Sequence, residues 1–142
     1  MPLMTRWPGH IAPDSRSDAL VSQVDLLASF AALTGASAPG SARDSLNVAS
    51  ALLGTSRSAR QRLVEHAGGL ALVDSSWKLV FPAQGPKRNE ETNTDLGNSS
   101  EPQLFNIVDD PGERNDVAAR FPEKVRDMSR AFEAIRNGAP PP

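Results

Sequence analysis

The chain has 142 residues, of which 39% are hydrophobic and 23% are charged, and its formal net charge is -2. This composition is ordinary for a folded globular protein. The 15 basic residues are scattered along the sequence, whereas nucleic-acid recognition favours a clustered basic face. We therefore expect no nucleic-acid partner.

Cysteine is absent, which excludes disulfides and thiolate metal sites. No segment approaches the roughly 20 apolar residues that span a bilayer, and the first residues lack the apolar stretch of a signal peptide. We therefore expect no membrane partner and, for the chain as written, a cytoplasmic location.

Residues 1–7 are predicted to form a short strand. Leu3, Thr5 and Trp7 would lie on one of its faces, and the pair Pro8-Gly9 ends the pattern. An unpaired strand exposes backbone donors and acceptors. This strand must therefore pair with later segments or with another molecule.

A helix is predicted from Ser22 to about Thr34. Ser22 is the expected N-cap, Asp25 stands at the third helical position and supports the helix start, and Gly35 suits the C-cap. Apolar residues surround most of the circumference, so this helix requires cover on more than one side; they are Val24, Leu26, Leu27, Phe30, Ala31 and Leu33. A short second helix is predicted near residues 48–53.

From about residue 61 the pattern changes to strands. Three of them are expected to form an antiparallel meander, at residues 62–66, 70–74 and 77–81, with a turn at 67–69. Residues 82–102 are polar and are predicted to be a mobile loop. A fourth strand is predicted at residues 103–107.

The last part of the chain is predicted to be a turn followed by a helix. Pro111-Gly112 is a strong turn signal, and Pro122 suits the first turn of a helix. The apolar stripe of this helix should cover one face of the four-stranded sheet; it consists of Val125, Met128, Phe132 and Ile135.

Several sequence blocks, in this order and spacing, resemble the type I sulfatase family and in particular the arylsulfatases. The resemblance extends from about residue 1 to about residue 137. The blocks are RWPGHI at residues 6–11, SDALVSQVDLL at 17–27, DSLN at 44–47, WKLV at 77–80, QLFNI at 103–107 and DDPGERND at 109–116.

The resemblance implies the C-terminal portion of such an enzyme. The expected fold is α/β for the whole family member and α+β for this part. It would comprise the last strand and helices of an alkaline-phosphatase-like core, followed by a small four-stranded antiparallel sheet packed on a C-terminal helix. The implied parts are a core end at 1–54, a linker at 55–60, a C-terminal subdomain at 61–137 and a disordered tail at 138–142.

Complete family members hydrolyse sulfate esters with calcium and a formylglycine made from a Cys/Ser-x-Pro-x-Arg motif. These elements precede the Arg-Trp-Pro-Gly block in the family, and no such motif occurs in this chain. We therefore expect no catalytic residue and no metal ligand here, and no activity of the chain alone. Calcium and formylglycine are expected only in a complete member, which would usually be periplasmic, secreted or lysosomal.

The expected partner is the missing N-terminal sulfatase core, or a second copy held through the apolar surface of residues 1–54. The alternative function is a free-standing, non-catalytic binding module derived from a sulfatase tail.

His66, beside Glu65 at a predicted strand end, is the candidate substrate-binding residue, because imidazole can donate to a sulfate or sugar oxygen. The alternative is a histidine that merely flanks a turn. His10 is expected to be a surface or packing residue, and the two histidines form no metal motif.

The carboxylate-rich stretch at 109–116 lacks the calcium-loop pattern and is expected to be structural, with Asn115 or Asp116 bound to local backbone. Trp77 is expected in the core by strand alternation, and Lys78 on the opposite face, beside an acidic residue.

Overall fold

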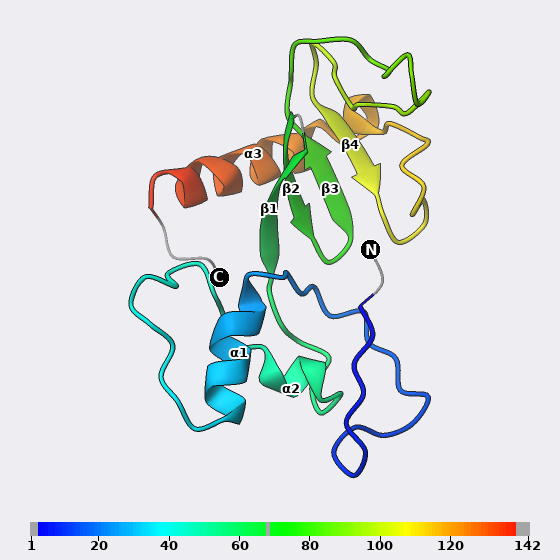
Figure 1. Cartoon of the computed structure of the whole chain (residues 1–142). Coiled ribbons are helices and arrows are strands. Elements are labelled where there is room, and N and C mark those ends of the chain that lie inside the picture. The colour runs from blue at the N-terminus through cyan, green and yellow to red at the C-terminus, as the bar shows by residue number, and fades with distance from the viewer. Residues whose placement is uncertain (1–2, 68, 139–142) are drawn as a thin grey trace. The chain divides into compact units, whose positions relative to one another are not determined.

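The computed structural model describes residues 3–67 and 69–138 (Figure 1). Within these ranges, residues 3–61 form one compact unit, and residues 62–67 and 69–138 form a second. Within the described ranges, no helix combines the length and the apolar character needed to cross a membrane.

The first unit contains two helices, α1 (Asp25–Leu33) and α2 (Ala49–Leu52). Both were expected from the sequence. The apolar centre of this unit is small and consists of buried Val48, Ala51 and Leu52. Side chains from the loops and from α1 pack around it, namely Ala19, Val21, Leu26, Leu46 and Ala59.

The start of α1 differs from the prediction. The helix begins at Asp25, and no side chain caps it. Ser22 is therefore not the N-cap; instead its backbone N–H donates to Asp25 Oδ2 at 2.9 Å. The predicted end is confirmed, since Thr34 follows the last helical residue and Gly35 has a φ of 74°.

The strand predicted at residues 1–7 is wrong for the residues that the structure describes. Residues 3–7 are irregular, and Met1 and Pro2 lie outside the described ranges. The physical reason is the missing neighbour, because a strand exists only through hydrogen bonds to another one. Here the Trp7 carbonyl accepts from His10 N–H and Ile11 N–H in a turn, and the Thr5 hydroxyl donates to the Leu52 carbonyl at 3.1 Å.

The second unit is a four-stranded antiparallel sheet in the order β1-β2-β3-β4, as predicted. The strands are β1 (Arg62–Ala67), β2 (Gly69–Asp74), β3 (Trp77–Val80) and β4 (Gln103–Asn106). The 3₁₀ turn η1 (Ala118–Arg120) precedes the terminal helix α3 (Pro122–Arg136). Gly68, in the predicted turn, lies outside the described residues, as does the expected tail beyond Gly138.

Helix α3 crosses one face of this sheet (Figure 1). Its Met128 and Phe132 are buried against three side chains of the sheet that have no exposed surface, namely Leu72, Leu79 and Leu104. Trp77 and Phe81 pack against the same cluster, and the Phe81 and Phe132 ring centroids are 4.2 Å apart. The predicted core face of β3 and the predicted stripe of α3 are thus confirmed.

Residues 82–102 connect β3 to β4 and are irregular apart from a single isolated bridge between Arg88 and Asp95. On the face of β3 opposite Leu79, Lys78 Nζ lies 2.8 Å from Glu113 Oε1. The acidic partner expected for Lys78 is therefore present.

Candidate functional site

His66 lies in β1, opposite Leu70 of β2, and its side chain is exposed. The neighbouring Glu65 is on the other face of the strand, where its Oε2 is 3.7 Å from Lys78 Nζ. The structure therefore pairs Glu65 with a lysine and leaves His66 at the sheet surface, close to the turn between β1 and β2.

His10 belongs to the first unit and stacks on Trp7, with ring centroids 4.0 Å apart and an interplanar angle of 20°. Its Nδ1 lies 3.5 Å from the Pro8 carbonyl oxygen. This is the packing role expected for His10. The two histidines occupy different units and do not form a common site.

Two carboxylates of the acidic stretch accept hydrogen bonds from backbone N–H groups. Asp110 Oδ2 accepts from Arg114 N–H at 2.8 Å and from Asn115 N–H at 2.7 Å. Asp116 Oδ1 accepts from Leu104 N–H at 3.0 Å and Ala118 N–H at 2.9 Å. These bonds confirm the structural role expected for Asp116.

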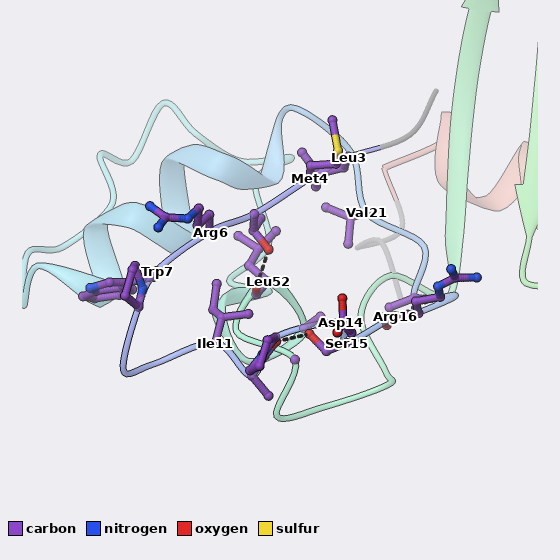
Figure 2. Close-up of a pocket in the computed structure, with 18 of the residues that line it drawn as sticks. Leu3, Met4, Arg6, Trp7, Ile11, Asp14, Ser15, Arg16, Val21 and Leu52 are labelled. Atoms are coloured by element: carbon purple, nitrogen blue, oxygen red, sulfur yellow. Dashed lines mark hydrogen bonds between the residues drawn. The ribbon is translucent and has the colours of Figure 1, made fainter.

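The first unit has an open hollow of about 1170 Å³ between residues 3–21 and 51–54 (Figure 2). Leu3, Met4, Ile11 and Val21 line it together with charged side chains such as Arg6 and Arg16. The hydroxyls on its walls are already bound to backbone: Thr5 donates to Leu52 and Ser15 donates to Ala12, the latter at 2.9 Å. The hollow therefore has walls of mixed apolar and charged character.

A buried ion pair joins α1 to the end of the first unit. Asp25 has no exposed surface, and Arg60 is 8% exposed. Arg60 Nη2 donates to Asp25 Oδ1 at 2.6 Å, and Arg60 Nε donates to Asp25 Oδ2 at 3.0 Å. Arg60 Nη2 also contacts the Asp44 carbonyl. The paired geometry fits the rigid fork of a guanidinium.

The remaining lone pairs of Asp25 are also used. Its carboxylate accepts from Leu46 N–H at 3.0 Å as well as from Ser22 N–H. Burial raises the pKa of Asp25, but the hydrogen bonds from Arg60 and from these two amides outweigh it, so the pKa lies below its ordinary value of 3.8. Asp25 is ionised in the folded protein at neutral pH.

Three further bonds extend this polar contact along α1. Ser29 Oγ accepts from Val48 N–H at 2.9 Å and donates to the Asp25 carbonyl at 2.7 Å. Ala28 N–H donates to Ser45 Oγ at 2.9 Å. The inner side of α1 is therefore attached to residues 44–48 mainly by hydrogen bonds. We call Asp25, Ser29, Ser45 and Arg60 the polar network of α1.

The opposite side of α1 is apolar and uncovered. Val24 is 50% exposed, Leu27 is 51% exposed and Phe30 is 55% exposed. We call these three side chains, of which Val24 directly precedes the helix, the apolar face of α1. Exposed apolar side chains that gather on one surface are typical of interaction sites.

Sequence reasoning placed Asp25 at the helix start but missed its partner Arg60. The two residues are 35 positions apart, so local spacing carries no signal for the pair. The only hint is the acidic residue Asp25 in a helix whose other residues, apart from Ser29, are apolar.

No family model matches the chain. Single proteins do. The chain is 36% identical over 139 residues to the N-acetylgalactosamine-6-O-sulfatase of Bacteroides thetaiotaomicron, and 34% and 32% identical to the arylsulfatases A of Bos taurus and Homo sapiens. The matches cover 91 to 96% of this chain, but only 27 to 29% of the relatives.

Solved structures agree with these relatives. One from work on glycosaminoglycan metabolism by Bacteroides thetaiotaomicron superposes with a TM-score of 0.85 at 36% identity, over 93% of this chain and 28% of the other. A second, Ps i-CgsB, gives a TM-score of 0.66 at 26% identity, over 94% of this chain and 28% of the other. A small α+β structure with a four-stranded antiparallel sheet is the C-terminal architecture of these proteins. The relatives that match nearly the whole length of this chain are sulfatases, and the chain corresponds to their C-terminal region.

The family implies calcium and formylglycine, but the residues present here do not fit either group. Across residues 3–67 and 69–138, no three His, Cys, Asp or Glu side chains gather where they could hold a metal. The sequence also contains no Cys/Ser-x-Pro-x-Arg motif from which formylglycine could form.

Proposed function

We propose that this chain supplies the C-terminal part of an enzyme that hydrolyses sulfate esters, and that it has no hydrolytic activity alone. The observation that carries the proposal is the 36% identity over 139 residues to a sulfatase of which the chain spans only 27%. The nucleophile motif would come from the part of the relatives that this chain does not span.

In this proposal the two compact units correspond to two different parts of the enzyme. The first unit, with its uncovered hollow and the apolar face of α1, is the end of the sulfatase core. The second unit, with its own core of Leu72, Leu79 and Leu104, is the C-terminal subdomain. In this proposal residues 1–54 attach to the missing core, residues 55–60 link the units, and residues 61–137 form the subdomain.

The partner is the polypeptide that corresponds to the upstream part of the relatives. Covering half-exposed apolar side chains removes apolar area from water, which stabilises association by roughly 25 cal/mol per Å². Val24, Leu27 and Phe30 supply such area on one side of α1. A second copy of the chain could use the same surface when the core is absent.

A chimera tests the proposed function. The C-terminal region of the Bacteroides thetaiotaomicron sulfatase is replaced by this chain, and hydrolysis of N-acetylgalactosamine 6-sulfate and of an aryl sulfate is measured. We expect turnover by the chimera and none by the purified chain, with or without calcium. The same chimera with Cys or Ser of the nucleophile motif changed to Ala is the control.

Two results would contradict the proposal. Hydrolysis by the purified chain would show that it carries a nucleophile of its own. A chimera that folds but is inactive, while the recipient enzyme is active in the same assay, would favour the alternative of a non-catalytic binding module.

We also propose that His66 contacts the substrate in the complete enzyme. Its support is an exposed imidazole at the end of β1, next to the β1–β2 turn. In the chimera, His66→Gln should raise KM with little change in kcat, because a binding contact is lost and no reacting group is removed. His10→Gln is the matched control, and equal effects of both variants would argue against a role for His66.

A further inference from the structure

Helix α1 is folded with its polar side inward. Asp25 and Ser29 have no exposed surface, whereas Val24, Leu27 and Phe30 are each about half exposed. A helix at a protein surface normally buries its apolar side and turns its polar side to water. A specific set of contacts must therefore hold α1 in the opposite orientation.

The polar network of α1 supplies these contacts. Arg60 binds both carboxylate oxygens of Asp25, at 2.6 and 3.0 Å. Ser29 Oγ accepts from Val48 N–H, and Ser45 Oγ accepts from Ala28 N–H, both at 2.9 Å. Each bond needs the side of α1 that carries Asp25 and Ser29 to face residues 44–48 and Arg60.

Arg60 is itself held in place by its own backbone. Its N–H donates to the Leu20 carbonyl at 3.0 Å, and its guanidinium also contacts the Asp44 carbonyl. The position of the positive charge in the first unit is thus fixed by contacts other than those to Asp25. Rotation of α1 about its axis would separate Asp25 from this charge and leave the buried Arg60 guanidinium without its carboxylate partner.

We propose that the Asp25–Arg60 pair is an orientation latch, which keeps α1 turned so that Val24, Leu27 and Phe30 form a docking surface for the upstream polypeptide. Asp25 and Arg60 are positioning residues for this surface. Only the identity of the docked polypeptide rests on the proposed function; the latch itself rests on the contacts within the first unit.

Loss of the Asp25–Arg60 pair should change which side of α1 is buried. Without Arg60 the buried Asp25 carboxylate is unpaired, which is unfavourable in a site without water. Rotation of α1 would then return Asp25 to water and bring Leu27 and Phe30 inward. The expected change is an exchange of the buried and exposed sides of one helix.

Thiol reactivity measures this exchange directly, because the sequence contains no cysteine. Leu27→Cys reports the apolar face, and Ala28→Cys reports the inner side, where Ala28 is 8% exposed. With Arg60 intact, the thiol at position 27 should react roughly tenfold faster with a disulfide reagent than the thiol at position 28. In Arg60→Met the order should reverse.

Arg60→Lys keeps a positive charge beside Asp25 and should retain the original order with a smaller ratio. Arg130→Met removes a guanidinium from the exposed side of α3 and should leave both rates unchanged. These two variants separate a loss of the latch from a general loss of positive charge.

Two outcomes of the Arg60→Met measurement would overturn the proposal. An unchanged order would mean that the pair does not set the orientation of α1. Reaction of both thiols at the rate of a free peptide would mean that the pair only stabilises the fold. The assay needs no sulfatase activity, so an inactive chimera together with a reversed thiol order would reject the proposed function and keep the latch.

Discussion

A single carboxylate, that of Asp25, carries four hydrogen bonds in the interior of the first unit. A buried charge is tolerated when paired and fully hydrogen-bonded, whereas removal of one partner typically costs about 3–5 kcal/mol. Asp25 is therefore the residue whose substitution should most disturb this unit.

The lowered pKa of Asp25 makes this contribution dependent on pH. A carboxyl whose folded pKa lies below its unfolded value of about 3.9 stabilises the fold above that value and loses the effect as the pH falls through the folded pKa. We expect the free energy of unfolding of the first unit to decrease below about pH 4. Asp25→Asn should lower this free energy at neutral pH and flatten its dependence on pH.

Urea unfolding at a series of pH values checks this prediction. Trp77→Phe leaves Trp7 as the single tryptophan, so that fluorescence reports the first unit. Asp127→Asn removes the same charge from an exposed pair on α3 and serves as the control. Parallel curves for the unsubstituted chain and Asp25→Asn would rule out a contribution of Asp25 to the acid transition.

At the scale of elements, the strands of the second unit could be predicted closely and the environment of α1 could not. The β2 and β3 boundaries follow from alternating apolar residues such as Leu72 and Leu79, and from the Ser75-Ser76 turn between the strands. The orientation of α1 depends instead on Arg60, which is distant in sequence. The prediction of a strand at residues 1–7 was wrong for residues 3–7, because the described residues include no neighbouring strand with which they pair.

The contribution of α3 packing to the free energy of unfolding of the second unit can be measured. Phe132 is 6% exposed and its ring lies 4.2 Å from that of Phe81. Phe132→Ala should lower the free energy of unfolding of the second unit by about 3–5 kcal/mol, through lost burial and the remaining cavity. Urea unfolding followed by Trp77 fluorescence in a Trp7→Phe background measures this loss.

Arg130→Ala, on the exposed side of the same helix, is the matched control and should change the free energy by less than about 0.5 kcal/mol. Equal effects of the two substitutions would mean that α3 does not contribute its apolar stripe to the core.

At the scale of the whole molecule, the first unit exposes several large apolar side chains. Leu3, Met4, Val24, Leu27 and Phe30 are each at least half exposed. Exposed apolar patches of this kind promote association. We expect the purified chain to self-associate as its concentration rises, in the absence of the upstream polypeptide.

Sedimentation velocity over a range of concentrations tests this expectation. Phe30→Glu places a charge in the apolar face of α1 and should shift the chain toward monomer. Ala134→Glu, at an exposed position of α3, adds the same charge elsewhere and should not. Association that is insensitive to Phe30→Glu would place the contact outside the apolar face of α1.

The hydrogen bonds of Asp74 fix the length of the turn between β2 and β3. Asp74 Oδ1 accepts from Ser76 N–H at 2.8 Å and Trp77 N–H at 2.7 Å, while Oδ2 accepts from Lys124 of α3 at 2.9 Å. An inserted residue would break this attachment of the turn to the helix. The hydrogen bonds within residues 82–102, such as that from Leu96 N–H to the Lys87 carbonyl at 2.8 Å, join residues of this connection to one another. Insertions and deletions that arise during the divergence of this region should therefore accumulate in that connection and spare the β2–β3 turn.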